Sequence, residues 1–356
     1  MFPDLHDAGC STSGRISNTF VTQPGGSEEY QNLARTTTRW GVILSGGYGT
    51  HLLGLTRLIV GDDRPKQFCP LFGGSTLLEK MRQRAARSIS AERILFPLLR
   101  AHRPFFLQEP GIRPSQRIVQ PLDRGTAPAI AHSILSIHHR DKNALVAILP
   151  CDHYYPGESA FTAALETAFD VAARHPASVV LLGVTPPRDT QTVHGWIELG
   201  QPVNPSGDTF QVRSFCDRPS PRFAKQLIDR GALWNTLVMV GHVDAFLNMI
   251  NASRAGLANA FHGGCLWAGE EVNIAEPCYQ RIYAVDFSRD VLSIQAPNLL
   301  TLRAGLPGWN DLREPQSLID ILEGANTSLP WMKEWRVTGQ ILARAAAQFE
   351  PLEPRK

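Results

Sequence analysis

A glycine-rich segment near residue 45 has a composition that suits phosphate binding. Residues 45–50 read Ser-Gly-Gly-Tyr-Gly-Thr and directly follow the apolar run Trp40–Leu44. Glycine leaves the backbone amides of such a turn open, because no side chain blocks an approaching phosphate. Lys66, one of only six lysines, could add a positive charge to the same site. A glycine-rich turn by itself is weakly specific, since many such turns only connect elements.

Two aspartates outside this loop could hold a divalent cation. Asp152 follows Ala144–Leu149, the clearest buried strand that the sequence predicts, and Asp311 lies in a predicted loop. Carboxylate oxygens beside phosphates suit Mg²⁺, which prefers oxygen ligands and keeps several waters. Either aspartate could instead cap a helix or a turn. His153 points to the opposite face of a strand from Asp152, so a packing role is favoured over an acid–base pair.

Composition and missing signatures exclude several function classes. The 356-residue chain has a net charge of +2, which gives no reason to expect a nucleic-acid or membrane partner. Neither a Walker A motif nor a GxSxG elbow is present. The six cysteines lack the spacing of a zinc site or a disulfide framework. No apolar run reaches the length of a membrane span, and the N-terminus does not resemble a signal peptide, so we expect a cytoplasmic protein.

The elements that must position these residues alternate between strand and helix. Strands are predicted over 40–44, 93–97, 117–120, 144–149 and 178–184, and helices over 75–86, 130–138 and 161–174. This order predicts an α/β fold, an open and mostly parallel Rossmann-like sheet with helices on both faces. Ligands of such sheets bind beyond the carboxyl ends of the strands, where the glycine-rich loop and Asp152 would meet.

The pattern of predicted elements changes in the second half of the chain. Strand-like pieces at 196–199 and 210–215, separated by Pro, Asn and Gly, predict a small antiparallel insertion forming one wall of the cleft. Further strands are predicted over 233–240, 291–294 and 299–302. We divide the chain into a flexible N-terminal extension (1–38), a catalytic domain (39–315) and a helical C-terminal segment (316–356). That last segment could pack on the catalytic domain or form a homodimer contact.

Seven motifs, in order, resemble those of the sugar-nucleotide nucleotidyltransferases, specifically the bacterial mannose-1-phosphate guanylyltransferases, whose fold is GT-A-like. The resemblance covers residues 39–315. The motifs are Leu44-Ser-Gly-Gly-Tyr-Gly-Thr50 with Pro65-Lys-Gln-Phe68, Arg124-Gly-Thr-Ala-Pro-Ala129, Leu149-Pro-Cys-Asp-His153, Gly195-Trp-Ile-Glu198, Phe215-Cys-Asp-Arg-Pro219, Leu233-Trp-Asn-Thr236 and Trp309-Asn-Asp-Leu312.

The resemblance implies transfer of a nucleotidyl group from an NTP, here GTP, to mannose 1-phosphate. The products would be GDP-mannose and pyrophosphate. It implies catalytic roles for Lys66, Asp152 and His51, and a Mg²⁺ ion held by Asp152 and Asp311. The implied nucleotide-binding residues are Leu44, Gly46, Gly47, Gly49, Thr50, Gln120, Arg124, Gly125 and Thr126. The implied sugar-phosphate-binding residues are Gly195, Glu198, Asp217, Arg218 and Asn235, with Arg213 as a further candidate for the phosphate.

Several positions depart from the family's pattern. His51 stands in place of an arginine that can grip phosphate in bidentate fashion at any pH. Gly54 replaces a proline, and Asp217-Arg218 replaces Glu-Lys. Arg313 replaces a glycine, so a positive φ there would strain the Asp311 loop. These departures leave open a second hypothesis, a catalytically weak or inactive homologue that binds sugar nucleotide and regulates a partner.

Overall fold

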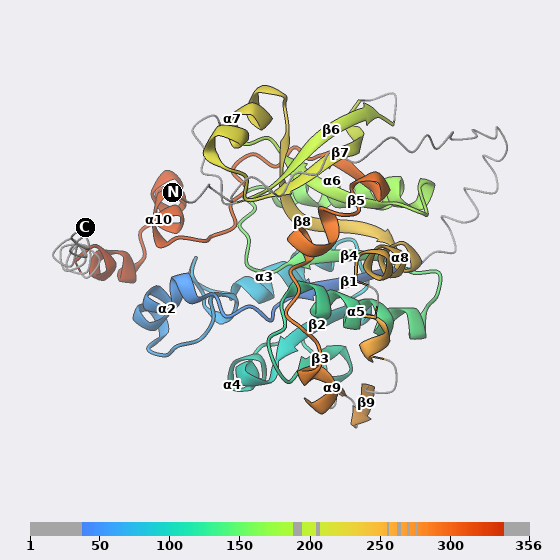
Figure 1. The fold of residues 1–356 in the computed structure, drawn as a ribbon. Coiled ribbons are helices and arrows are strands. Elements are labelled where there is room, and N and C mark those ends of the chain that lie inside the picture. Colours follow the sequence, from blue (N-terminus) through green and yellow to red (C-terminus); the bar gives the residue numbers. More distant parts are fainter. Residues whose placement is uncertain are drawn as a thin grey trace, which may run out of the picture.

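The computed structural model describes residues 38–187, 194–203, 207–254, 256–261, 265–268, 271–274 and 276–337. Nearly all of the predicted N-terminal extension, and residues 338–356 of the C-terminal segment, lie outside these ranges. Within them, a central sheet has the strand order β5-β11-β7-β6-β8-β4-β1-β2-β3-β10-β9, with helices packed on both of its faces (Figure 1).

The strands and helices have the following bounds. The strands are β1 (Arg39–Leu44), β2 (Ile94–Leu99), β3 (Arg117–Gln120), β4 (Leu145–Pro150), β5 (Val179–Val184), β6 (Gly195–Pro202), β7 (Thr209–Asp217), β8 (Leu233–His242), β9 (Cys265–Ala268), β10 (Glu271–Ile274) and β11 (Leu299–Arg303). The helices are α2 (Leu53–Val60), α3 (Leu77–Ala85), α4 (Arg103–Phe106), α5 (Thr126–Arg140), α6 (Glu158–Arg174), α7 (Pro221–Asp229), α8 (Val243–Ser253), α9 (Glu276–Gln280) and α10 (Pro315–Gly324).

The sheet is mixed, which corrects the prediction of a mostly parallel one. β1 pairs in parallel with β2 and β4, and β2 with β3, as the alternating pattern predicts. β8 then runs antiparallel to both β4 and β5. β5, β11, β7 and β6 continue from β8, and β6 pairs with β8 again, so five strands form a closed ring. An apolar run has no direction, so the positions of these strands did not indicate that β8 runs antiparallel to its neighbours.

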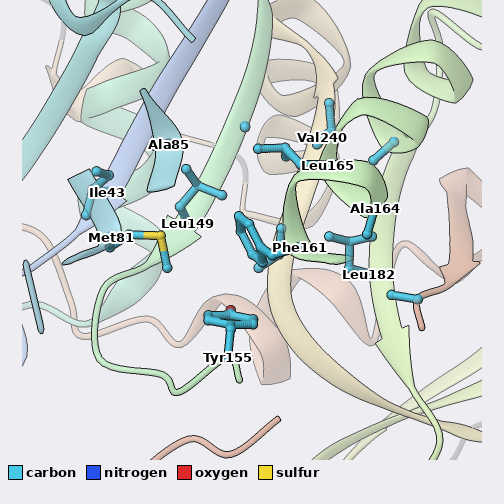
Figure 2. Close-up of a cluster of buried hydrophobic side chains, with 14 of the residues drawn as sticks. Ile43, Met81, Ala85, Leu149, Tyr155, Phe161, Ala164, Leu165, Leu182 and Val240 are labelled. Atoms are coloured by element: carbon cyan, nitrogen blue, oxygen red, sulfur yellow. The ribbon is translucent and has the colours of Figure 1, made fainter. Parts of the chain in front are cut away.

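Successive residues of the central strands pack into two separate cores. Val42 packs with α5 and α8 on one face of the sheet, while Ile43 packs with α3 and α6 on the other. Every residue of β4 and of β5 is buried, which explains why these strands read as continuous apolar runs. Figure 2 shows the second core, where Phe161 of α6 lies close to Tyr155, with ring centroids 4.6 Å apart.

Two predicted segments fold differently from the prediction. The sequence predicts a strand over 291–294, but Ser288–Leu292 is a π-helix, because the apolar pair Val291 and Leu292 can be buried by a helix as well as by a strand. A helix is predicted over 130–138, but α5 begins four residues earlier, at Thr126. Pro128 lies in the first turn of that helix, where the missing amide hydrogen costs nothing.

The C-terminal helix α10 packs against the segment that follows the glycine-rich loop. Leu318, Ile319 and Leu322 of α10 share a third hydrophobic cluster with Leu52 and Leu55 at the start of α2. The helical residues 330–337 extend this cluster through Trp331 and Met332. Of the two roles predicted for this segment, packing on the catalytic domain is therefore observed.

His132 on α5 gives the stability of the protein a pH dependence. Its ring is fully buried and stacks on Phe261, and burial lowers its pKa from 6.5 to about 3. Below pH 6.5 the unfolded chain binds a proton that the folded chain does not, so stability falls as pH falls. Between pH 7 and pH 5 this site should cost about 2 kcal/mol.

This dependence can be measured by urea unfolding at both pH values. His132→Leu should have a shallower loss of stability on acidification than the wild type. His139→Gln, an exposed position on the same helix, should keep the wild-type loss. Equal losses in all three proteins would contradict the assignment to His132.

Candidate active site

The glycine-rich loop is folded around the side chain of Gln67. The Gln67 amide donates hydrogen bonds to the carbonyl oxygens of Ser45 (3.0 Å) and Gly47 (2.7 Å). Gly49 has φ 59°, and a Cβ atom there would lie 3.1 Å from Cγ of Lys66. Glycine at this position therefore allows both the left-handed turn and the close approach of the lysine.

Lys66 joins segments that are far apart in the sequence. Its Nζ donates hydrogen bonds to the carbonyl oxygens of Asp311 (2.9 Å) and Leu312 (3.0 Å), and it lies 3.2 Å from Oδ2 of Asp152. An ammonium group has three donors, so these partners satisfy it. The side chain is only 8% exposed. The predicted convergence of Lys66, Asp152 and Asp311 is thus present in the fold.

A short backbone bridge holds the two aspartate segments together. The amide of Tyr154 donates to the carbonyl of Asn310 (2.7 Å), and the amide of Asn310 donates back to Tyr154 (3.2 Å). Asp152 lies two residues before this bridge and Asp311 one residue after it. The separation of the two carboxylates is therefore set by backbone hydrogen bonds as well as by Lys66.

Both aspartates are held in their ionised form. Burial acts to raise the pKa of Asp152, but the charges of Lys66 and His153 outweigh burial and lower that pKa. Burial also opposes ionisation of Asp311. His194, whose Nε2 lies 3.3 Å from its Oδ2, and Arg313 at 3.1 Å nevertheless hold the pKa of Asp311 well below its usual range.

The donor set at this point fits a hard cation such as Mg²⁺. It consists of two ionised carboxylates beside a phosphate-sized opening, and oxygen ligands are those that Mg²⁺ prefers. Among the described residues, no three His, Cys, Asp or Glu side chains are grouped as a metal site. Asp152 and Asp311 would therefore hold the ion together with substrate oxygens and water, as is usual for Mg²⁺ at phosphate sites.

The loop around Asp311 is strained at Leu312, not at Arg313. Leu312 has φ 47°, while Arg313 is not among the positive-φ residues. The side chain of Asn310 accepts a hydrogen bond from the Leu312 amide at 2.7 Å, which holds this turn. The strain that a positive φ at Arg313 would have caused does not arise, because the left-handed residue is its predecessor. Arg313 therefore causes no backbone strain in this loop.

Two adjoining cavities lie around the lysine and the aspartates. The larger, about 270 Å³, has the glycine-rich loop on one side. It is lined by Gly49, Thr50, His51, Leu52, Lys66, Asp152, His153, Arg218, Asp311 and Arg313. The smaller, about 150 Å³, shares His153, Arg218, Asp311 and Arg313 with it. The two cavities therefore meet at these four residues.

The smaller cavity brings together most of the predicted sugar-side residues. Gly195, Asp217, Arg218 and Asn235 all line it. A Cβ at Gly195 would lie 2.8 Å from the Phe215 ring, so glycine is required there. Burial raises the pKa of Asp217, with Asp286 adding to the effect.

Glu198 and Arg213 are placed differently from these residues. Glu198 accepts hydrogen bonds from Ser214 (2.9 Å) and Arg230 (3.2 Å), and Arg213 is an exposed side chain 3.9 Å from the same carboxylate. Neither lines the two cavities.

The predicted nucleotide-binding residues Gln120, Gly125 and Thr126 are held by close contacts with other segments. The Tyr279 hydroxyl donates to Oε1 of Gln120, which leaves the Gln120 amino group near Gly46. Gly125 has φ 84°, and the carbonyl of Val285 would lie 2.6 Å from a Cβ there. Thr126 accepts a hydrogen bond from the Phe287 amide at 2.8 Å, so this segment is anchored to residues 285–287.

Comparison with known proteins decides the family. Residues 40–327 match the family model described as nucleotidyl transferase, which is most of the chain. The chain belongs to the nucleotidyl transferase family. The resemblance drawn from the motifs is therefore confirmed at the level of the family.

Relatives within this family are similar over much of the chain. The Xanthan biosynthesis protein XanB of Xanthomonas campestris is 27% identical over 289 residues, covering 79% of this chain and 59% of that relative. A mannose-1-phosphate guanylyltransferase of Escherichia coli is 28% identical over 60% of this chain and 46% of its own length. The chain thus spans less than two thirds of the length of these curated relatives.

Two solved structures have a fold similar to that of this chain. A Thermus thermophilus structure described as a mannose-1-phosphate geranyltransferase has a TM-score of 0.66 and 27% identity, covering 78% of this chain and 77% of that one. A UDP-glucose pyrophosphorylase complexed with UDP-glucose has a TM-score of 0.52 at 11% identity, which supports the fold alone. Across the described ranges, no helix of this nucleotidyl transferase combines the length and apolar character needed to cross a membrane.

Three residues of the candidate site could not be identified from the sequence motifs. Gln67, which shapes the loop, lies within the motif 65–68, but the motif alone does not indicate this role. His194 directly precedes the recognised Gly195 and contacts Asp311. Tyr279 lies far from every motif, and only the fold brings its hydroxyl to Gln120.

Proposed function

We propose that this chain catalyses nucleotidyl transfer from GTP to mannose 1-phosphate, giving GDP-mannose and pyrophosphate. The observation that carries the proposal is the position of Lys66 and Asp152 in a cavity that adjoins the one lined by Gly195, Asp217 and Asn235. One cavity suits a triphosphate and the other a sugar phosphate. Their shared residues lie where the two substrates would meet.

The reaction would be a single in-line displacement. A phosphate oxygen of the sugar 1-phosphate attacks the α-phosphorus of the NTP, and the bond to the β-phosphate oxygen breaks to release pyrophosphate. On substrate binding Lys66 would exchange its contact with Asp152 for the α-phosphate, and Arg218 would bind the sugar phosphate, so positioning and charge neutralisation provide the rate enhancement. Mg²⁺ held by Asp152 and Asp311 would supply further neutralisation of phosphate charge.

Gln120 supports guanine as the base. Because Tyr279 occupies the side-chain oxygen of Gln120, the amino group is the part available for a ligand. A donor at this point favours a base with a carbonyl oxygen over one with an amino group at the same position. Guanine carries such an oxygen and adenine does not. A cytoplasmic location, expected from the sequence, and a homodimer, left open as one role of the C-terminal segment, stay predictions.

A second candidate function is that of a sugar-nucleotide-binding regulator with little activity. The observation that favours it is the contact of Arg313 with Asp311, Nε to Oδ2 at 3.1 Å, because this guanidinium competes with a metal ion for the same carboxylate. His51, which stands where the family has an arginine, also favours this second function.

Pyrophosphate release separates the two functions. The full chain is incubated with Mg²⁺, each of the four common NTPs and either mannose or glucose 1-phosphate. Release only with GTP and mannose 1-phosphate supports the proposal. Release with another pair alone would replace the substrates but keep the reaction. Thermal stabilisation by GDP-mannose without any release would favour the regulator.

Restoring the family's arginine should raise turnover. His51 is an exposed residue of the triphosphate cavity, and arginine there would keep its charge at every working pH. We expect His51→Arg to increase kcat about three- to tenfold, because arginine can bind a phosphate through two hydrogen bonds. His139→Arg, an exposed position on α5, serves as a control, and an equal gain there would remove this explanation.

A further inference from the structure

A third cavity lies outside the two that form the candidate active site. Its volume is about 300 Å³, and it lies between α3, the start of α6 and the segment after Asp152. The lining residues are Phe72, Leu77, Lys80, Gln83, Arg84, Arg87, His153, Tyr154, Tyr155 and Glu158. We call it the α3 pocket. Neither the glycine-rich loop nor Lys66 contributes to it.

The α3 pocket has an excess of positive charge. Lys80, Arg84 and Arg87 come from one side of α3 and its C-terminal end, while Glu158 is the single carboxylate in the lining. Glu158 is engaged by Arg84, whose Nε lies 3.0 Å away, and faces Arg87 at 3.8 Å. Three cations against one carboxylate leave a net charge that matches a dianion.

The cations of the α3 pocket differ in how firmly they are held. The guanidinium of Arg84 is only 6% exposed and lies over the rings of Tyr155 (5.0 Å) and Phe161 (5.4 Å). Arg84 is therefore a structural part of the wall. Arg87, 51% exposed, and Lys80 are the charges that can turn toward a ligand.

An aromatic surface forms another part of the wall. Phe72 and Tyr154 stack with ring centroids 5.0 Å apart, and Nζ of Lys80 lies 5.8 Å from the Phe72 ring centroid. A flat apolar face beside cations suits a molecule with a ring and a phosphate group. The volume of the pocket is that of a small metabolite, at the lower end of ligand sites.

The α3 pocket shares a wall with the active site. His153 lines this pocket and both active-site cavities. Tyr154, the next residue, forms the backbone bridge to Asn310 that fixes the spacing of the aspartates. A ligand resting on the Tyr154 ring would therefore contact the segment that fixes this spacing.

We infer that the α3 pocket binds a phosphate monoester with a ring, such as a hexose phosphate or a nucleoside monophosphate, and that this ligand activates the enzyme. Lys80 and Arg87 bind the phosphate, and the Phe72–Tyr154 stack supports the ring. Activation rests on the proposed function, whereas binding does not, so the two parts are tested separately.

Binding is tested by calorimetry with fructose 6-phosphate, GMP and inorganic phosphate. The Lys66→Met variant is used beside the wild type, since it weakens phosphate binding in the active site without touching the α3 pocket. We expect at least one monoester to bind both proteins with similar affinity. Arg87→Gln and Lys80→Gln should each weaken that binding about tenfold or more. Lys142→Gln, an exposed lysine elsewhere, should leave it unchanged.

Three results would overturn the inference. Absence of monoester binding to the wild type removes the site. Binding that disappears in Lys66→Met but persists in both α3-pocket variants places the ligand in the active site instead. Inorganic phosphate binding as tightly as the monoesters removes the role of the aromatic wall.

Activation is tested by pyrophosphate release with and without the bound monoester. Turnover should rise at least twofold in the wild type and not in Arg87→Gln, whose basal turnover should equal that of the wild type. Binding without a change in turnover, in an enzyme that releases pyrophosphate, overturns the coupling through Tyr154. If no pyrophosphate is released at all, the proposed function fails while the binding result stands.

Discussion

Replacing Lys66 by methionine is expected to lower kcat by at least about a hundredfold while leaving the protein folded. The ammonium group lies among Asp152 and the carbonyls of Asp311 and Leu312, where an α-phosphate would develop charge. Methionine keeps the length and apolar stem of lysine but removes that charge. The effect on turnover should therefore exceed the effect on KM.

The stability of the Lys66 variant should fall only modestly. Its partner Asp152 is 36% exposed, so water compensates part of the lost ion pair. We expect a loss of about 1–2 kcal/mol, which a domain of this size tolerates. Pyrophosphate release and urea unfolding measure the two quantities. Lys142→Met is the matched control, and a Lys66→Met variant within threefold of wild-type turnover would falsify the role given to Lys66.

Replacing Gly125 by alanine is expected to destabilise the protein by about 2–4 kcal/mol. The backbone there has φ 84°, and the new Cβ would lie 2.6 Å from the Val285 carbonyl oxygen. That carbonyl accepts from the Ala127 amide, and the Val285 amide donates to Arg124. Moving the 285–287 segment away breaks both bonds, so we also expect KM for the NTP to rise about tenfold.

A second glycine allows the cost of the left-handed backbone to be separated from the cost of the contact with Val285. Gly231 has a similar φ of 73°, but nothing lies within 4 Å of a Cβ there. Gly231→Ala should therefore cost only the left-handed backbone penalty, about 1–2 kcal/mol, with KM unchanged. Equal losses in the two variants, measured by urea unfolding, would show that the contact with Val285 contributes nothing.

Much of the site could be predicted because local chemistry dictated it. The glycines of the loop, Lys66 and the two aspartates are residue types with few uses in combination, and the fold brings them together as expected. Gln67 and His194 act through other groups, one by holding the loop and the other by holding Asp311. Their residue types alone do not indicate such roles, which depend on contacts that only the fold creates.

Features of the fold that depend on a local sequence pattern could be predicted. Features that depend on pairing with residues distant in the sequence could not. β1 and β4 are bounded apolar runs, so their positions followed from the sequence. The direction of β8 did not, because it depends on pairing with β4, about ninety residues earlier. The packing of α10 on α2 could not be predicted for the same reason. Apolar residues such as Leu318 and Leu55 fit an internal contact and a dimer interface equally well.

The closed ring of strands has a consequence for how the chain folds. β11 lies between β5 and β7, with Thr301 opposite both Leu181 and Phe210. These partners precede β11 by roughly 90 to 120 residues, so loop-closure entropy delays their pairing. Until residue 303 has been synthesised, β5 and β7 each present an unpaired edge on the ribosome. A nascent chain stalled before that point would be prone to aggregate through those edges.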